Sequence, residues 1–169
     1  MEKFANILNT YSGMLLESLG QTMLLTLLSL IFAFIIGLIF GLMNVSKKRV
    51  LNFIGTVYVD AVRGVPLIVL AYFIYFGIPA GVKAIGFTDF RLPALQAGTI
   101  ALSMNAGAYM AEIFRSGVNS VDRGQLEAGR SLGLSWLTTT TRIIIPQAIK
   151  TIIPTIFNEI IILVKAVAF

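Results

Sequence analysis

The sequence contains no cysteine and no histidine, and few of its 169 residues are charged. Without cysteine there is neither a thiolate nucleophile nor a disulfide, and without histidine the commonest general base and the usual zinc and haem ligands are missing. We therefore expect no catalytic residues and no metal site. Charged residues make up 12% of the chain, against about 25% in a typical soluble domain. With 57% hydrophobic residues and a mean hydropathy of +0.88, this composition indicates a membrane protein.

Four apolar stretches are long enough to cross a bilayer as helices, which takes about 20 residues each. An all-α membrane protein is predicted, because backbone groups in hydrocarbon must form their hydrogen bonds within the segment. Residues 1–19 are less apolar and are predicted to form a separate amphipathic helix on the outer surface, before one membrane domain over residues 20–169. The four predicted membrane helices are Gly20–Met43, Phe53–Ile78, Pro93–Phe114 and Ile143–Val164.

The basic residues gather in two of the loops between these helices. Lys47, Lys48 and Arg49 follow the first helix, and Arg115, Arg123, Arg130 and Arg142 surround the loop after the third. Because cytoplasmic loops carry an excess of Lys and Arg, both loops are predicted to be cytoplasmic and the N-terminus to lie outside. The net charge of +5 is accounted for in this way and does not call for nucleic acid.

The second basic loop, residues 118–142, has helix signals of its own. Residues 122–124 mark a turn, Gly133 is suited to end a first short helix, and Ser135 is suited to cap a second. Two short helices that meet at a glycine elbow suit docking into a groove on a partner protein.

At these residues the sequence resembles the permease subunits of bacterial ABC importers for polar amino acids. Their signature is EAA, three residues, Gly, nine residues, then Ile-x-Leu-Pro. Here Glu127, Ala128, Gly133 and Pro146 fall on that spacing, while Gly129 replaces the third Ala, and Ile145 replaces Leu. Residues 63–67 (RGVPL), 107–112 (GAYMAE), 124–128 (GQLEA), 146–148 (PQA) and 158–159 (NE) also resemble segments of this family, in the same order.

The resemblance implies the type I ABC importer fold and a cytoplasmic loop that inserts into an ATPase subunit. ATP is then bound by that partner, so no cofactor is expected here, and the chain has no GxxxxGK[ST] loop of its own. The implied partners are two ATPase subunits, an extracytoplasmic amino-acid-binding protein and a second permease copy or paralogue, in a bacterial inner membrane. The residues expected to couple to the ATPase are Glu127, Ala128, Gly129, Gly133, Leu134 and Pro146; for Glu127 the alternative is a solvated helix charge, and its expected role is to accept hydrogen bonds or pair with an arginine.

Polar residues inside the predicted membrane helices form a second set of candidates. An intramembrane charge marks a functional site by default, and the alternatives are a structural pair or an interhelical hydrogen bond. Arg63 has Asp60 on its own helical face and Glu112 on the third helix as candidate structural partners. The candidate substrate-pathway residues are Arg63, Asn105, Tyr109, Asn158 and Glu159.

One departure and two alternatives accompany this interpretation. The family usually continues through KDTSL into a fifth membrane helix, whereas here Lys165 is followed by AVAF, so a truncated or divergent chain is expected.

A secondary transporter or channel that needs no ATPase remains an alternative, although it predicts inverted repeats and no structured basic loop. An intramembrane enzyme is disfavoured by the lack of His and Cys. Glutamine, glutamate, arginine, histidine and cystine all remain open as substrates.

Overall fold

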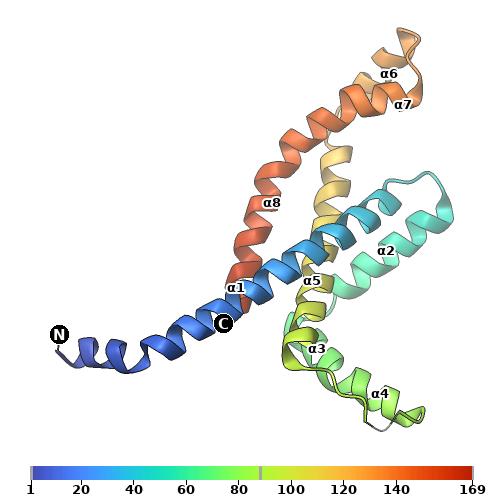
Figure 1. The fold of residues 1–169 in the computed structure, drawn as a ribbon. Helices are drawn as coiled ribbons and strands as arrows, with labels where there is room; N and C mark the ends of the chain where they lie inside the picture. The colour runs from blue at the N-terminus through green and yellow to red at the C-terminus, as the bar shows by residue number, and fades with distance from the viewer. Residues whose placement is uncertain (1, 88, 169) are drawn as a thin grey trace.

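The computed structural model describes residues 2–87 and 89–168, with side chains from residue 10 onward, and these residues form helices and connecting turns without a strand (Figure 1). The all-α fold class is therefore confirmed. Two ends of the predicted segments lie outside the described residues: Met1, at the start of the predicted surface segment, and Phe169, the last residue of the predicted membrane domain. The elements are α1 (Glu2–Asn44), α2 (Arg49–Arg63), α3 (Leu67–Tyr72), the π-helical turn η1 (Phe73–Gly77), α4 (Ile78–Ala84), α5 (Ala94–Asn119), α6 (Arg123–Ser131), α7 (Trp136–Thr139), the π-helical turn η2 (Thr140–Ile144) and α8 (Ile145–Ala168).

Helix α5 lies at the centre, and α1, α2, α3 and α8 all pack against it (Figure 1). Its contact with α1 is the most extensive, because small residues let the two backbones approach closely. A Cβ on Gly37 would lie 2.5 Å from the Cβ of Met110, and one on Gly41 would lie 2.8 Å from that of Phe114. The GxxxG pair of the first helix thus serves packing within the chain.

Helix α1 runs without a break from Glu2 to Asn44, so the helix boundary expected near residue 20 is wrong. No proline interrupts this segment, and its isolated glycines, Gly13 and Gly20, are tolerated within a helix. The location of residues 1–19 on the outer surface stays a prediction.

The predicted second membrane helix, Phe53–Ile78, is also wrong, because the chain breaks between α2 and α3. Gly64 ends α2, and Pro66 adopts an extended conformation with φ −55° and ψ 137° before α3 begins. A residue before proline is disfavoured in the α conformation, so Val65 cannot easily continue the helix. Hydropathy averaged over the stretch does not detect this break, because its apolar residues outweigh Asp60 and Arg63.

Both π-helical turns end two residues before a proline. Turn η1 ends at Gly77, before Pro79, and η2 ends at Ile144, before Pro146. A proline inside a helix lacks the N–H and clashes with the carbonyl four residues earlier, and a locally wider turn relieves that clash. The predicted fourth membrane helix, Ile143–Val164, therefore begins earlier than expected, as one continuous helical stretch over Trp136–Ala168.

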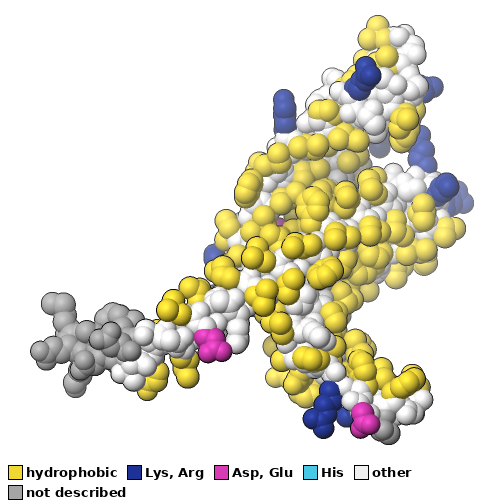
Figure 2. Space-filling view, viewed as in Figure 1, with side chains coloured by type: hydrophobic (Ala, Val, Ile, Leu, Met, Phe, Trp, Pro, Cys, Tyr) yellow, Lys and Arg dark blue, Asp and Glu magenta, His cyan; other side chains and the backbone are white. Residues whose placement is uncertain are grey.

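Three helical stretches of the described residues are long and apolar enough to cross a membrane: Thr10–Asn44, Leu67–Ala84 and Trp136–Ala168. The third predicted helix, Pro93–Phe114, is present as α5, whose 26 residues span about 39 Å. Helix α5 is less apolar than these three stretches, because many of its residues are small or polar and pack against the neighbouring helices. Figure 2 shows apolar side chains covering the outside of the bundle, as expected for a surface in contact with lipid.

The two basic loops lie at the same end of the molecule, as their charge predicted. Lys47, in the turn between α1 and α2, contacts Trp136 of α7 at this end. The turn between α4 and α5, with Asp89 and Arg91, lies at the opposite end (Figures 1 and 2).

Replacing Gly37 by Ala tests the close α1–α5 contact. The new methyl group would meet Met110 at 2.5 Å and the Gly107 carbonyl oxygen at 3.2 Å, so the helices must separate. We expect a loss of about 1–3 kcal/mol in the free energy of unfolding, measured by denaturation in detergent. Gly13→Ala is the matched control in the same helix, since nothing lies within 4 Å of its added Cβ. Equal stability of the two variants would contradict the role of this contact.

Candidate functional site

Residues 122–139 form a helical elbow at the basic end of the molecule, made of α6, a turn at Gly133 and α7. Helix α6 begins at Asp122, whose Oδ1 accepts a hydrogen bond of 2.7 Å from the backbone N–H of Gly124. It ends at Gly133, which has a φ of +79°. The Gly133 N–H donates to the Arg130 carbonyl at 3.0 Å, and the Leu134 N–H donates to the Gly129 carbonyl at 3.1 Å. This is the Schellman pattern, and it confirms that Gly133 ends the first short helix.

Ser135 caps the second arm of the elbow, as predicted, because its Oγ accepts a 3.1 Å hydrogen bond from the Thr138 N–H. The second arm is not a separate short helix, however. Helix α7 passes through η2 directly into α8, so Pro146 lies inside a continuous helical stretch. The elbow is therefore joined rigidly to the last apolar helix.

The two arms of the elbow touch at Gly129. A Cβ at this position would lie 2.5 Å from Cγ2 and 2.8 Å from Oγ1 of Thr139, which is fully buried. The Thr139 hydroxyl donates to the Ser135 carbonyl at 3.0 Å and is fixed by that bond. Glycine in place of the family's third alanine is thus matched to the threonine that faces it.

The outer surface of the elbow is exposed. Glu127, Ala128, Gly133 and Pro146 are exposed, whereas Gly129 is buried and Leu134 is half-buried. Two leucines project from the tip, Leu132 with 81% of its surface exposed and Leu137 with 64%. Glu127 has no ion pair or hydrogen bond within the described residues, so the predicted arginine partner is not found inside the chain. The elbow thus presents an acidic side chain and apolar side chains that nothing in the described chain covers.

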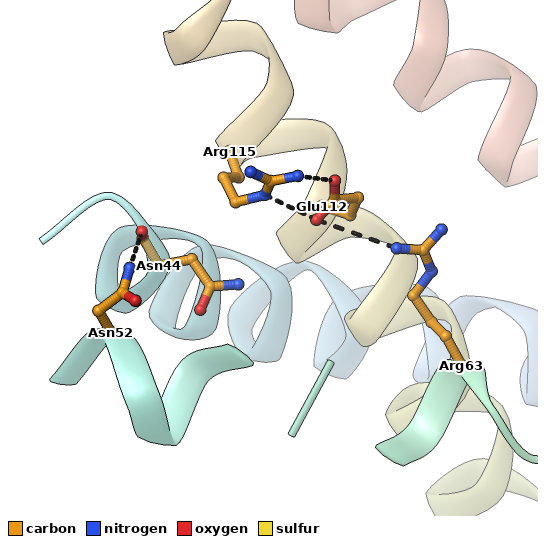
Figure 3. Close-up of polar contacts among 5 residues, drawn as sticks. All are labelled: Asn44, Asn52, Arg63, Glu112 and Arg115. Atoms are coloured by element: carbon orange, nitrogen blue, oxygen red, sulfur yellow. Dashed lines mark hydrogen bonds and ion pairs between the residues drawn. The ribbon is translucent and has the colours of Figure 1, made fainter. Parts of the chain in front are cut away.

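A second group of polar side chains, the polar cluster, joins α2, α5 and α8. It consists of Arg63, Tyr109, Glu112, Arg115 and Glu159. Arg115 binds both carboxylate oxygens of Glu112, with Nε donating to Oε2 at 2.8 Å and Nη2 donating to Oε1 (Figure 3). The nearest Arg63 nitrogen lies 3.9 Å from Glu112 Oε2. Glu112 is therefore held firmly by its own helix and more loosely by α2.

Arg63 has further neighbours in the polar cluster. Its guanidinium lies over the ring of Tyr109, 5.1 Å from the centroid. Glu159 of α8 is only 7% exposed and feels the charge of Arg63, but the two form no ion pair among the described residues. Asp60, the other candidate partner, forms no ion pair with Arg63 either and instead acts electrostatically on Arg115. The cation of α2 thus pairs loosely with Glu112 of α5 and acts only at longer range on Glu159 of α8.

The remaining candidates lie outside this cluster. Asn158 is exposed although its neighbour Glu159 is buried, and Asn105 is half-buried without a hydrogen bond in the described chain.

Two contacts were not predicted from the sequence. Arg115 counts in the sequence only as a loop charge, although its i, i+3 spacing from Glu112 suits an ion pair. Tyr58, whose hydroxyl donates to the Met104 carbonyl at 2.8 Å, carries no comparable sequence signal.

Beside the polar cluster, toward the basic end, lies a polar pocket of about 340 Å³. Residues of α1, α2 and α5 line it, among them Asn44, Asn52, Asp60, Glu112 and Arg115. Asn52 Nδ2 donates to the Asn44 carbonyl at 2.5 Å and closes the α1–α2 turn at the edge of this pocket (Figure 3). Polar side chains therefore continue from the polar cluster toward the basic end.

An apolar helical bundle with charged residues between its helices and an exposed elbow at its basic end defines an integral membrane subunit with a docking surface. The family of binding-protein-dependent transport system inner membrane components matches residues 33–169. The chain belongs to this family. The resemblance of its motifs to ABC importer permeases is thereby confirmed.

Two permease proteins of Bacillus subtilis are similar to this chain. The probable glutamine ABC transporter permease protein GlnM of Bacillus subtilis is 36% identical over 90% of this chain and 68% of its own length. The L-cystine transport system permease protein TcyB of the same species is 40% identical over 85% of this chain and 58% of its own length. The chain thus spans about 60–70% of the length of these two relatives.

Two solved structures of ABC transporters have a fold similar to that of this chain. A crystal structure of an amino acid ABC transporter with histidines matches 95% of this chain and 72% of its own, with a TM-score of 0.85 and 37% identity. The MetNI methionine ABC transporter in an inward-facing conformation matches with a TM-score of 0.71 at 21% identity, over 92% of this chain and 72% of its own, which shows the shared fold. The fold is that of the membrane subunits of type I ABC importers.

Gly129→Ala tests the contact inside the elbow. The added methyl group would meet the fixed Thr139 side chain, so we expect a loss of about 1–3 kcal/mol in stability or a local opening of the elbow. Because the chain lacks cysteine, a pair of introduced cysteines carrying spin labels on α6 and α8 reports that opening without background. Thr139→Ala in the same chain should restore the wild-type distance. A double variant as perturbed as Gly129→Ala alone would contradict the contact.

Proposed function

We propose that this chain is a permease subunit of an ATP-driven amino acid importer, which lines the translocation pathway and couples to an ATPase through its elbow. The observation that carries the proposal is the elbow itself: a capped helix, a Schellman turn and an exposed apolar tip, continuous with an apolar helix. An elbow of this kind transmits a displacement at its tip to α8, because no flexible linker lies between them. The relatives named as glutamine, L-cystine and amino acid transporters support amino acids as the substrate class.

The proposal includes the surroundings of the chain. The elbow and the turn between α1 and α2 face the cytoplasm of a bacterial cell, by the positive-inside rule, with the N-terminus on the outer side of the inner membrane. The partners are ATPase subunits, a second permease copy or paralogue, an extracytoplasmic amino-acid-binding protein and membrane lipid. ATP binds to the ATPase subunits. The role of this chain is conformational and not catalytic.

The proposal assigns distinct roles to the two groups of residues. Glu127, Ala128, Gly129, Gly133, Leu134 and Pro146 build or present the docking surface. Arg63 of α2 and the buried Glu159 of α8 are suited by their charge to the carboxylate and ammonium groups of an amino acid. Tyr109 presents its ring beside Arg63, and Asn105 and Asn158 line the pathway farther from the cluster.

Glu127→Lys tests the coupling role. The reversal of charge on the exposed face of α6 should lower the amount of co-purifying ATPase by about tenfold or more, as expected for the loss of a central interface residue. Asp89→Lys is the control, because it makes the same change in charge at the opposite end of the molecule. Substrate uptake by the wild-type chain without any ATPase would instead favour a secondary transporter or channel.

Glu159→Gln tests the pathway role. Replacing the buried carboxyl group by an amide of the same shape removes the acidic group proposed to pair with the substrate ammonium, so we expect uptake to fall by roughly tenfold while the ATPase still co-purifies. Glu17→Gln, on the exposed part of α1, should transport normally. Unchanged uptake by Glu159→Gln would remove this residue from the pathway.

A further inference from the structure

The elbow touches the bundle at a second place, away from its junction with α8. The Nζ atom of Lys47, in the turn between α1 and α2, lies 5.7 Å from the centroid of the Trp136 ring at the start of α7. A cation within about 6 Å of a tryptophan ring is attracted to its face. Among the hydrogen bonds, ion pairs and ring contacts of the described residues, this contact alone joins the elbow to the hairpin formed by α1 and α2.

The backbone that carries Lys47 is held in place. The Val45 N–H donates to the Gly41 carbonyl at 3.2 Å, and the Ser46 N–H donates to the Met43 carbonyl at 3.1 Å, so α1 ends in an ordered turn. The hydrogen bond from Asn52 to the Asn44 carbonyl then fixes the start of α2 against that turn. A force on Lys47 therefore moves the whole turn and is not absorbed by a loose loop.

The hairpin leads directly to the polar cluster. Helix α2 is a single 15-residue helix from this turn to Arg63, whose guanidinium lies 3.9 Å from the Glu112 carboxylate. Midway along it, Tyr58 stacks on Phe40 of α1, with ring centroids 3.9 Å apart, and its hydroxyl binds α5. The two helices of the hairpin are thus locked together between Lys47 and Arg63.

We propose that Lys47 is a positioning residue for transport, through which a displacement of the elbow reaches Arg63 by way of α2. This inference rests on the proposed function, since it requires that a partner moves the elbow. Helix α8 carries Glu159, and α2 carries Arg63. A partner that moves the elbow therefore displaces both sides of the polar cluster together when Lys47 holds Trp136, and only the α8 side when it does not.

The test uses the complete transport complex with its ATPase and binding protein in lipid vesicles, and measures substrate transported per ATP hydrolysed. Lys47→Gln should lower this ratio about two- to fivefold, the range expected for an exposed cation–π contact. Lys47→Arg keeps the cation and should restore the ratio. Lys48→Gln is the matched control, because the neighbouring lysine side chain makes no hydrogen bond, ion pair or ring contact with the described residues.

A double-variant cycle with Trp136→Leu tests whether Lys47 acts through its contact with the Trp136 ring. Lys47→Gln should have no further effect on the ratio once Trp136 is Leu, because both changes remove the same contact. Trp136 is also the only tryptophan of the chain, so its emission in the purified subunit should shift with Lys47→Gln and not with Lys48→Gln.

Two results would overturn the inference: a Lys47→Gln complex with the same ratio as Lys48→Gln, or effects of Lys47→Gln and Trp136→Leu that simply add. Either result leaves the proposed function intact, provided that the wild-type complex assembles and transports. Failure of the wild-type chain to retain an ATPase is a different outcome, which overturns the proposed function and the inference with it.

Discussion

The close approach of α1 and α5 is the contact on which the rest of the structure depends. Glycines at positions 37, 41 and 107 bring the two backbones together, and this places α5 where α2, α3 and α8 also reach it. In lipid there is no hydrophobic force between helices, so contact of this kind, built on small residues, supplies the packing energy. Because four helices pack against α5, its small and polar residues Thr99, Ser103, Ala106 and Gly107 are buried, and Glu112 next to them is partly covered.

Charge in the interior is organised around this central helix. Glu112 is bound through both oxygens by Arg115 of the same helix, so this pair forms without help from its neighbours. Arg63 comes from another helix and reaches Glu112 only at 3.9 Å. The Glu112–Arg115 pair is therefore a fixed feature of α5, whereas the position of Arg63 depends on how α2 lies against the bundle.

The sequence predicts those features that depend on local chemistry. Gly133 and Ser135 act at the ends of α6 and α7 as their cap preferences predict, because capping involves only neighbouring backbone. Gly64 and Pro66 mark the break between α2 and α3, but the overall apolar length of Phe53–Ile78 masks it. The faces of α8 relative to the elbow could not be predicted either. A π-helical turn holds one more residue than an α-helical turn, so η2 shifts the phase of every residue after it.

The difference between Arg63 and Arg115 bears on what the polar cluster can do. A carboxylate that arrives at Arg63 has to replace only the long contact to Glu112. Glu112 would keep its bidentate partner Arg115, so no charge on α5 would be left unpaired, which is the costly outcome when an ion pair is broken. Arg63 is thus the member of the polar cluster that can exchange partners at the least cost, and it stands at the end of the helix that starts next to Lys47.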